Sequence, residues 1–310
     1  MKNVLVVGGA GFIGSALCRA LLEKTRVVCL DNLMRGKMEN ISDLLDKSGF
    51  TFCQADANDF DFLKKVVLEN SIDYIFHLAA NSDIQFSAEN PQIEFDSTCK
   101  TTWTILRVMK ETGIKKLFFA STSAVYGEMK DRPFKEGDPL SPVSYYGSAK
   151  KASESFIEAF SFMNGIDALI FRFPNVIGPN LTHGVIYDFI RRLKADGSHL
   201  DVLGNGSQIK PYLHVFDLIS AIDLLCWDNV GLNIFNVGPD SATRVAAIAE
   251  MVIEEMGLKN CTIRYGTENV GWKGDVPKFA YCLQKIESKG WRPSMTSDEA
   301  VRLAIKEALR

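Results

Sequence analysis

Tyr146 and Lys150 are the two residues whose types and spacing most directly suggest chemistry. Because they are four residues apart, they would share one face of a helix. An ammonium group close to a phenol favours the phenolate, so Lys150 is expected to lower the pKa of Tyr146. A tyrosine of that kind can act as a general base near neutral pH. The alternative is an ordinary surface pair on an amphipathic helix.

A second pattern, near the start of the chain, joins an apolar strand, a glycine turn and a helix. Gly8 and Gly11 would let the backbone turn tightly and approach a pyrophosphate, and Gly14 would let the helix pack closely on the strand. The helix N-terminus supplies amide donors and a positive dipole for phosphate. The spacing is G-x-x-G-x-x-G rather than G-x-G-x-x-G, so a plain tight turn is the alternative.

Acidic residues follow the next two predicted strands. Asp31 comes about 20 residues after Gly11, where the ribose-binding acid of a dinucleotide site is expected. A carboxylate there favours NAD, because it would repel a 2′-phosphate, although the nearby Arg35 could blur that preference. Asp56 could accept a hydrogen bond from the adenine amine. A solvated loop acid is the alternative for Asp31, and a turn acid for Asp56. His77, within an apolar strand, is expected to be a core histidine.

The elements that must position these residues alternate between strand and helix through the first half of the chain. Apolar runs predict strands at 3–7, 26–30, 51–54, 74–78, 116–120 and 168–172. Helical spacing predicts helices at 12–23, 60–69, 91–112 and 146–163. The alternation predicts an α/β fold with a doubly wound parallel sheet, Rossmann-like. We therefore expect an NAD-binding domain over 1–173, which also receives segments near 210–238, and a mostly substrate-binding region over 174–310.

Composition and charge argue against several classes of protein. Of the 310 residues, 46% are apolar and 24% charged, which is ordinary for a globular protein, and the net charge of −3 gives no support for a nucleic-acid surface. No apolar run approaches the ~20 residues that span a bilayer, and we expect neither a membrane partner nor a signal peptide. The seven cysteines are scattered without a C-x-x-C pair, which predicts a reducing cytoplasm and no metal site.

Taken together, the motifs resemble those of the extended short-chain dehydrogenase/reductase family, in its nucleotide-sugar epimerase/dehydratase group. They run along essentially the whole chain, at 8–14, 31–33, 77–80, 121–127, 146–150, 175–179, 204–208 and 271–275. The resemblance implies that NAD is the cofactor. It assigns NAD binding to Gly8, Gly11, Phe12, Ile13, Gly14, Asp31, Asn32, Asp56, Ala57, Leu78, Ala79, Ala80, Tyr146 and Lys150.

The resemblance also assigns catalytic roles. Thr122 would hydrogen-bond the reacting sugar hydroxyl, and Ser123 could share that role. Tyr146 would be the base, while Lys150 would lower its pKa and hold the nicotinamide ribose. Relatives that eliminate water carry Asp-Glu after this threonine, whereas this chain has Ser123-Ala124. Since elimination needs an additional acid and base, the sequence favours C4 epimerisation of a UDP-glucose/UDP-galactose-type sugar through a transient 4-keto intermediate.

Departures from the family pattern leave the nucleotide and the sugar open. Substrate contacts are expected from Asn175, Lys210 and Lys273, together with Thr122 and Tyr146. The two lysines stand where relatives often carry arginine, and lysine lacks the bidentate fork. Relatives also commonly carry asparagine at the position of Thr98.

Two other hypotheses remain. One is a nucleotide-sugar dehydratase or 4-ketoreductase that uses the same tyrosine. The other is a non-catalytic dinucleotide-binding regulator, because a fold alone does not establish activity.

Relatives pair through two long helices of each subunit, so the resemblance also implies a homodimer.

Overall fold

The computed structural model describes residues 1–81, 84–129, 132–269 and 276–310. The chain forms two compact units whose segments alternate along the sequence. The first unit contains residues 1–125, 145–172 and 222–235. The second contains residues 126–144, 173–221 and 236–310. Neither unit is therefore one continuous stretch of chain.

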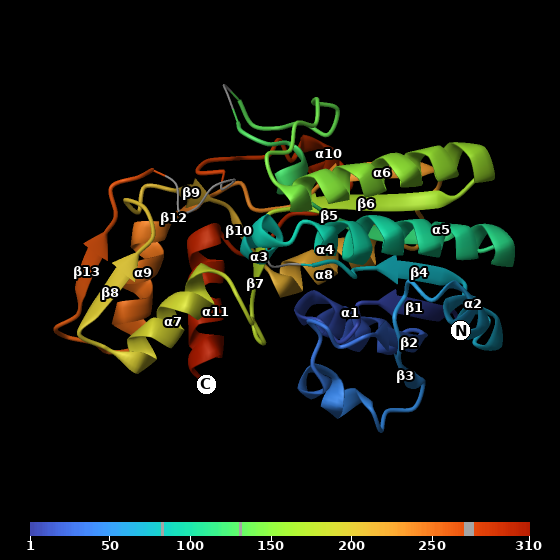
Figure 1. Ribbon diagram of the computed structural model, residues 1–310, viewed down its shortest axis with the longest axis horizontal. Coiled ribbons are helices and arrows are strands. Elements are labelled where there is room, and N and C mark those ends of the chain that lie inside the picture. Colours follow the sequence, from blue (N-terminus) through green and yellow to red (C-terminus); the bar gives the residue numbers. More distant parts are fainter. Residues whose placement is uncertain (82–83, 130–131, 270–275) are drawn as a thin grey trace. The chain divides into compact units, whose positions relative to one another are not determined.

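A seven-stranded parallel sheet forms the centre of the first unit (Figure 1). Its strands are β1 (Asn3–Val7), β2 (Arg26–Asp31), β3 (Phe50–Gln54), β4 (Tyr74–His77), β5 (Lys116–Thr122), β6 (Asp167–Phe173) and β11 (Leu232–Asn236). Their order is β11-β6-β5-β4-β1-β2-β3, so the sheet grows outward in both directions from β1 and β4. The predicted doubly wound α/β fold is confirmed, and ligands of such sheets bind where the strand order reverses.

Helices cover both faces of this sheet. On one face, α2 (Phe60–Glu69), α5 (Thr101–Thr112) and α6 (Tyr145–Asn164) share an apolar core with alternate strand residues such as Leu5 and Phe119. On the other face, the strands present aromatic side chains, and the Tyr74 and Phe76 rings stack with centroids 4.4 Å apart. Here α1 (Phe12–Leu22) places Cys18 beside Cys29 of β2. Because both faces are buried, the strands read as nearly continuous apolar runs.

The predicted helix over 91–112 contains an irregular turn. The helical path starts as α4 (Gln92–Glu94), continues as the π-helical segment η2 (Phe95–Lys100) and ends as α5 at Gly113. The remaining elements of the first unit are the 3₁₀ segments η1 (Met38–Leu44) and η3 (Ser123–Val125), and α3 (Ile84–Glu89). Single-turn π segments are often found at functional sites, and this one directly follows the buried Glu94 and contains the buried Thr98.

The second unit consists of short strand pairs and a three-helix core. The pairs are β7 (Asn175–Ile177) with β10 (Tyr212–His214), β8 (His199–Val202) with β13 (Thr262–Tyr265), and β9 (Ile209–Lys210) with β12 (Thr243–Arg244). The helices α7 (Val185–Ala195), α9 (Val245–Glu255) and α11 (Ser297–Leu309) share one apolar cluster. A capping box between Thr296 and Glu299 starts α11. The short α10 (Gln284–Glu287) precedes it, and α8 (Val215–Leu225) leads back to the first unit.

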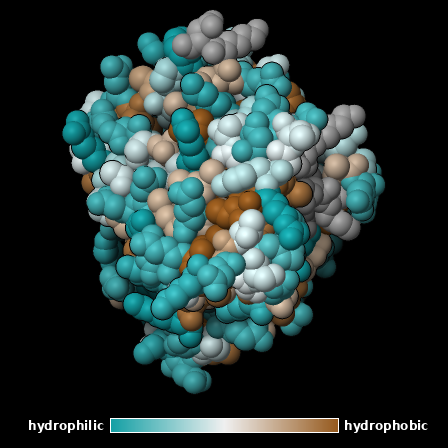
Figure 2. All heavy atoms as spheres, turned by 90° about the vertical axis from the view of Figure 1, so that its left-hand side faces the viewer, coloured by the Kyte–Doolittle hydropathy of each residue, from teal (hydrophilic) through white to brown (hydrophobic). Residues whose placement is uncertain are grey.

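The surface is mainly polar on the face that Figure 2 shows, and hydrophobic residues gather there only in small areas near the middle. Among the described residues, no helix has the length and apolar character needed to cross a membrane. In the same part of the chain, no group of three or more His, Cys, Asp and Glu side chains could hold a metal ion.

Candidate active site

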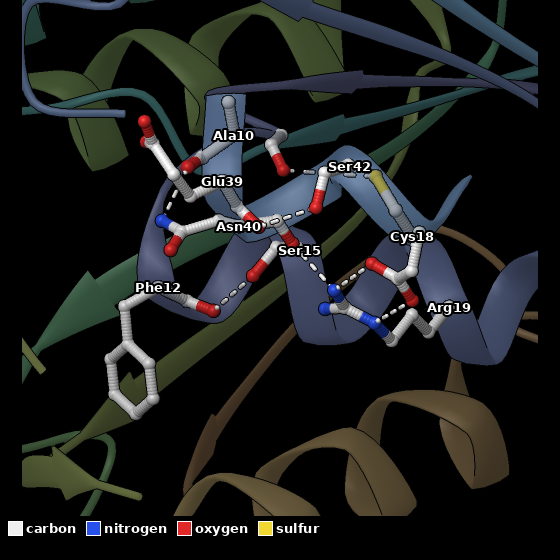
Figure 3. Close-up of polar contacts among 10 residues, drawn as sticks. Ala10, Phe12, Ser15, Cys18, Arg19, Glu39, Asn40 and Ser42 are labelled. Atoms are coloured by element: carbon white, nitrogen blue, oxygen red, sulfur yellow. Dashed lines mark hydrogen bonds and ion pairs between the residues drawn. The ribbon is translucent and has the colours of Figure 1, made fainter. Parts of the chain in front are cut away.

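The glycine turn between β1 and α1 is fixed by contacts from two directions. Gly8 has a φ of +83°, and a Cβ there would lie 2.7 Å from the amide nitrogen of Ala79, so only glycine fits. Asn40 of η1 donates to the carbonyl oxygen of Ala10 at 2.8 Å, and Arg19 of α1 donates to the carbonyl of Asn40 (Figure 3). No side chain caps the start of α1 at Gly11. The start of α1 therefore keeps the uncapped backbone that a pyrophosphate requires, and pyrophosphate binding there stays a prediction.

Asp31, at the end of β2, lies against this turn. Its carboxylate accepts hydrogen bonds from the amides of Ala10 at 2.9 Å and Leu33 at 2.8 Å, and also from that of Gly11. Burial raises the pKa of Asp31, while these three amides lower it. A Cβ at Gly36 would lie 2.7 Å from Oδ1, so the following segment packs directly on the carboxylate. This placement beside the glycine turn fits the ribose-binding acid of an NAD site.

The other predicted cofactor residues follow strands at the same edge of the sheet. Leu78 continues β4, and its amide donates to the carbonyl of Val7 at 2.9 Å. Asn32 and Asp56 each accept a hydrogen bond from the amide two residues later, at 3.0 and 2.8 Å. Their side chains therefore form local turns. Direct contact of any of these residues with NAD stays a prediction.

Three of the predicted catalytic residues come together in the first unit. Thr122 is the last residue of β5, and its hydroxyl shares a hydrogen bond with that of Tyr146. Lys150 is only 2% exposed. Its Nζ donates to the carbonyl oxygen of Ala120 at 2.6 Å and lies 5.9 Å from the centroid of the Tyr146 ring. The predicted helix face therefore does bring Tyr146 and Lys150 close to each other.

Burial is the largest influence on both members of this pair. It raises the pKa of Tyr146, and the nearby Glu94 raises it further, whereas the bond to Thr122 lowers it. Burial lowers the pKa of Lys150 to about 8, and the carboxylates of Glu94 and Glu154 oppose this change. The lowered pKa of Tyr146 that the spacing to Lys150 predicts is therefore wrong, because burial and Glu94 shift this pKa upward. Residue spacing alone carries no information about burial.

A buried ion pair supports the helix that carries Tyr146 and Lys150. Arg172 of β6 donates to Glu154 of α6, with 2.6 Å between Nη2 and Oε2, and both side chains are at most 3% exposed. The hydroxyl of Ser121 also donates to Glu154. These bonds tie α6 to the strand ends beside Thr122. Sequence reasoning missed Glu154, although it lies one helical turn after Lys150 on the same face.

Sequence reasoning also missed Glu94, a buried acid that ends α4 and affects the pKa values of both Tyr146 and Lys150. The available signal was its spacing of four residues from Thr98 on the predicted 91–112 helix. His77 is a wholly buried histidine with Nε2 2.9 Å from the Thr102 hydroxyl oxygen. Burial and the charge of Lys150 hold the pKa of His77 well below its usual range. It is a core residue, as the sequence indicates.

The predicted substrate residues outside this cluster belong to other parts of the chain. Asn175 is exposed on β7, and Lys210 is half-buried on β9, where it pairs with Thr243 of β12; both belong to the second unit. Lys273 lies outside the described residues, with the rest of the 271–275 motif. Ser123 is half-buried at the start of η3, next to Thr122. The roles of these residues stay predictions.

Comparison with known proteins identifies the family. The model of the NAD dependent epimerase/dehydratase family matches residues 4–238, which is most of the chain. The chain belongs to this family. Its members are NAD-dependent enzymes, so the predicted cofactor, NAD, is confirmed, as is the epimerase/dehydratase resemblance.

Individual relatives of this family member include both epimerases and dehydratases. It is 32% identical over 309 residues to a Methanocaldococcus jannaschii protein named "Putative UDP-glucose 4-epimerase", with 97% of each chain covered. It is 28% identical to dTDP-D-glucose 4,6-dehydratase of Mus musculus, over 98% of this chain and 88% of that one. The structure of Thermus thermophilus UDP-glucose 4-epimerase in complex with NAD matches with a TM-score of 0.88 at 29% identity, over 99% and 98% of the two chains.

Proposed function

We propose that the protein interconverts the C4 epimers of a nucleotide-diphosphate sugar of the UDP-glucose/UDP-galactose type, with NAD retained between turnovers. The observation that carries this proposal is the end of β5, where Thr122 meets Tyr146 and is followed by Ser123 and Ala124. A dehydratase needs a further acid and base in addition to the tyrosine. The nearby Glu94 is bonded to Asn81, Ser87 and Thr98 instead.

Each residue of the cluster then has one part in the reaction. Tyr146 takes the proton from the C4 hydroxyl and later returns it, while Thr122 orients that hydroxyl and shares the proton. Lys150 supplies a positive charge that stabilises the phenolate of Tyr146. Bound NAD supplies the hydride chemistry at C4. Inversion requires the 4-keto sugar to turn over between the two steps, so its diphosphate must stay anchored, which we assign to Asn175, Lys210 and Lys273.

We also propose that two copies pair through α5 and α6, which lie side by side in the first unit (Figure 1). Trp103 of α5 is 41% exposed, and its ring centroid lies 5.3 Å from that of Phe156 and 5.6 Å from that of Phe160 on α6. Exposed aromatic clusters are typical of interfaces. A cytoplasmic location stays a prediction that rests on the cysteines.

The deciding experiment is incubation of the purified protein with UDP-galactose, with and without added NAD, followed by chromatography and mass spectrometry. We expect UDP-glucose of unchanged mass. A product lighter by one water would assign a dehydratase. A 4-keto product formed together with net reduction of added NAD⁺ to NADH would assign a ketoreductase running in reverse. Tyr146→Phe should lower turnover by roughly 10²–10⁴-fold, the usual contribution of acid–base catalysis. Tyr145→Phe is the matched control, because Tyr145 is 55% exposed and should leave turnover unchanged.

A further inference from the structure

Glu94 is a buried acid that the proposed reaction does not use. Its side chain is 2% exposed, and it stands directly before the π-helical segment η2. Oε1 accepts a hydrogen bond from Nδ2 of Asn81 at 2.8 Å, and the Thr98 hydroxyl lies 3.5 Å from Oε2. Ser87 donates a further hydrogen bond. Burial raises the pKa of Glu94, and these three donors oppose that rise by favouring the carboxylate.

The segment that carries Glu94 packs on α6 at Lys150. The Ser153 hydroxyl of α6 donates to the carbonyl oxygen of Thr98 at 3.5 Å, and the Cys99 thiol donates to the carbonyl oxygen of Ala149, the residue before Lys150, at 3.5 Å. The buried cation nearest to this carboxylate along α6 is Lys150. Within the described ranges, no lysine or arginine forms an ion pair with Glu94, while Lys150 lowers its pKa and Glu94 raises that of Lys150. Glu154, the other acid near Lys150, is paired with Arg172. Two other titratable groups are coupled to Lys150: Cys99 raises the pKa of Lys150, and Lys150 lowers the pKa of His77. Tyr146 lies one turn away on the same helix.

The same carboxylate is joined to the cofactor half of the site. Asn81 donates to Glu94 from Nδ2 and accepts at Oδ1 from Nη2 of Arg35 at 3.1 Å. Arg35 precedes Gly36, which packs on the carboxylate of Asp31 beside the glycine turn. A chain of hydrogen bonds therefore runs from the segment after β2 through Asn81 to Glu94.

We propose that Glu94 is a positioning residue whose negative charge keeps Lys150 in its ammonium form and, through Asn81, fixes that charge relative to the cofactor segment. This inference rests on the proposed function at one point, the role of Lys150 in stabilising the phenolate of Tyr146. Burial alone would favour the neutral amine of Lys150, which could not stabilise a phenolate. Glu94 counteracts this effect without bonding to Lys150 itself.

The test measures the titration of Lys150 directly and needs no sugar substrate. The protein is prepared with lysine labelled with ¹³C at Cε, and the Lys150 resonance is identified by its loss in Lys150→Met. Glu94→Gln keeps the side-chain shape and an acceptor for Asn81 but removes the negative charge. The midpoint of the Lys150 titration should therefore fall by roughly one pH unit, as expected for the loss of one nearby charge. Asp96→Asn is the control, because Asp96 lies two residues further on and bonds Gln92. An unchanged midpoint in Glu94→Gln overturns the proposal, whatever the sugar.

Two further readouts separate this role from a structural one. Loss of the Glu94 charge lowers the pKa of both Tyr146 and Lys150, so both limbs of the pH profile of turnover should move to lower pH; a fall in kcat with unmoved limbs argues against the proposal. In the unmutated protein, the Cδ resonance of Glu94, assigned with Glu94→Asp, should be that of a carboxylate at neutral pH and should respond again near pH 8, where Lys150 titrates. A protonated Glu94 at neutral pH overturns the proposal even if Glu94→Gln does not fold.

Discussion

Replacing Arg172 with methionine should destabilise the protein far more than loss of a surface arginine. Arg172 and Glu154 are 3% and 1% exposed, and the substitution leaves the carboxylate buried with Ser121 as its donor. Removing one partner of a buried ion pair costs about 3–5 kcal/mol. Because total stabilities are about 5–15 kcal/mol, this loss is a large share of the free energy of unfolding. Urea unfolding followed by circular dichroism should show a lower midpoint with an unchanged slope.

Two further variants make this prediction sharp. Glu154→Gln combined with Arg172→Met should recover much of the lost stability, because a neutral amide still accepts from Ser121 and neither charge of the ion pair is left buried without its partner. Arg302→Met is the control, since Arg302 and Glu254 are 43% and 66% exposed and such pairs contribute about 0–1 kcal/mol. The reasoning is refuted if Arg172→Met costs less than about 1 kcal/mol, or if the double variant is no more stable than the single one.

Three further predictions concern cofactor retention, pH dependence and assembly. Gly8→Ala should purify without bound NAD, because its Cβ would meet the Ala79 amide. The NAD content is measured by the absorbance of the supernatant after the protein is denatured and removed. Gly113→Ala is the control and should retain NAD, because Gly113 also has a positive φ (+81°) but has open space around its Cβ. The pKa of Lys150 is about 8, against an ordinary 10.5, so between these pH values the unfolded chain binds more protons than the folded one. The free energy of unfolding of the unmutated protein should therefore rise with pH across this window, compared with that of Lys150→Met. Melting temperatures of the two proteins that change with pH in the same way would contradict this. Trp103→Glu should convert a dimer to a monomer in sedimentation velocity, whereas Phe62→Glu, at a phenylalanine of α2 with similar exposure, should not.

The sheet was predictable from the sequence because its local signals are strong. The run Asn3–Val7 ends in glycines, and the predicted strand has the bounds of β1. The glycine turn, Asp31 and the Tyr146–Lys150 pair are recognisable for the same reason, since their chemistry depends on short spacings. Membership of segment 126–144 in the second unit was not predicted, because the sequence of a segment between two elements of the sheet does not show which unit it joins.

The electrostatics of the site could not be predicted from spacing. Glu94 resembles any acid of an exposed helix in the sequence, and its burial depends on Asn81, which comes from a different element. Burial also determines the direction of the Tyr146 pKa shift, which pairwise reasoning about Lys150 missed. Positions of apolar residues follow from local pattern, whereas the surroundings of a charge depend on segments distant in the sequence.

The alternation of segments between the two units constrains how this chain can be made. The strand β11, which borders β6 in the sheet, is synthesised only after residues 173–221 of the second unit. Until residue 236 leaves the ribosome, β6 has an unpaired edge, and such edges favour aggregation. A fragment that stops at residue 173 keeps Thr122, Tyr146 and Lys150 but exposes that edge permanently. The first unit therefore cannot be completed by the N-terminal half alone, and its final strand closes late in translation.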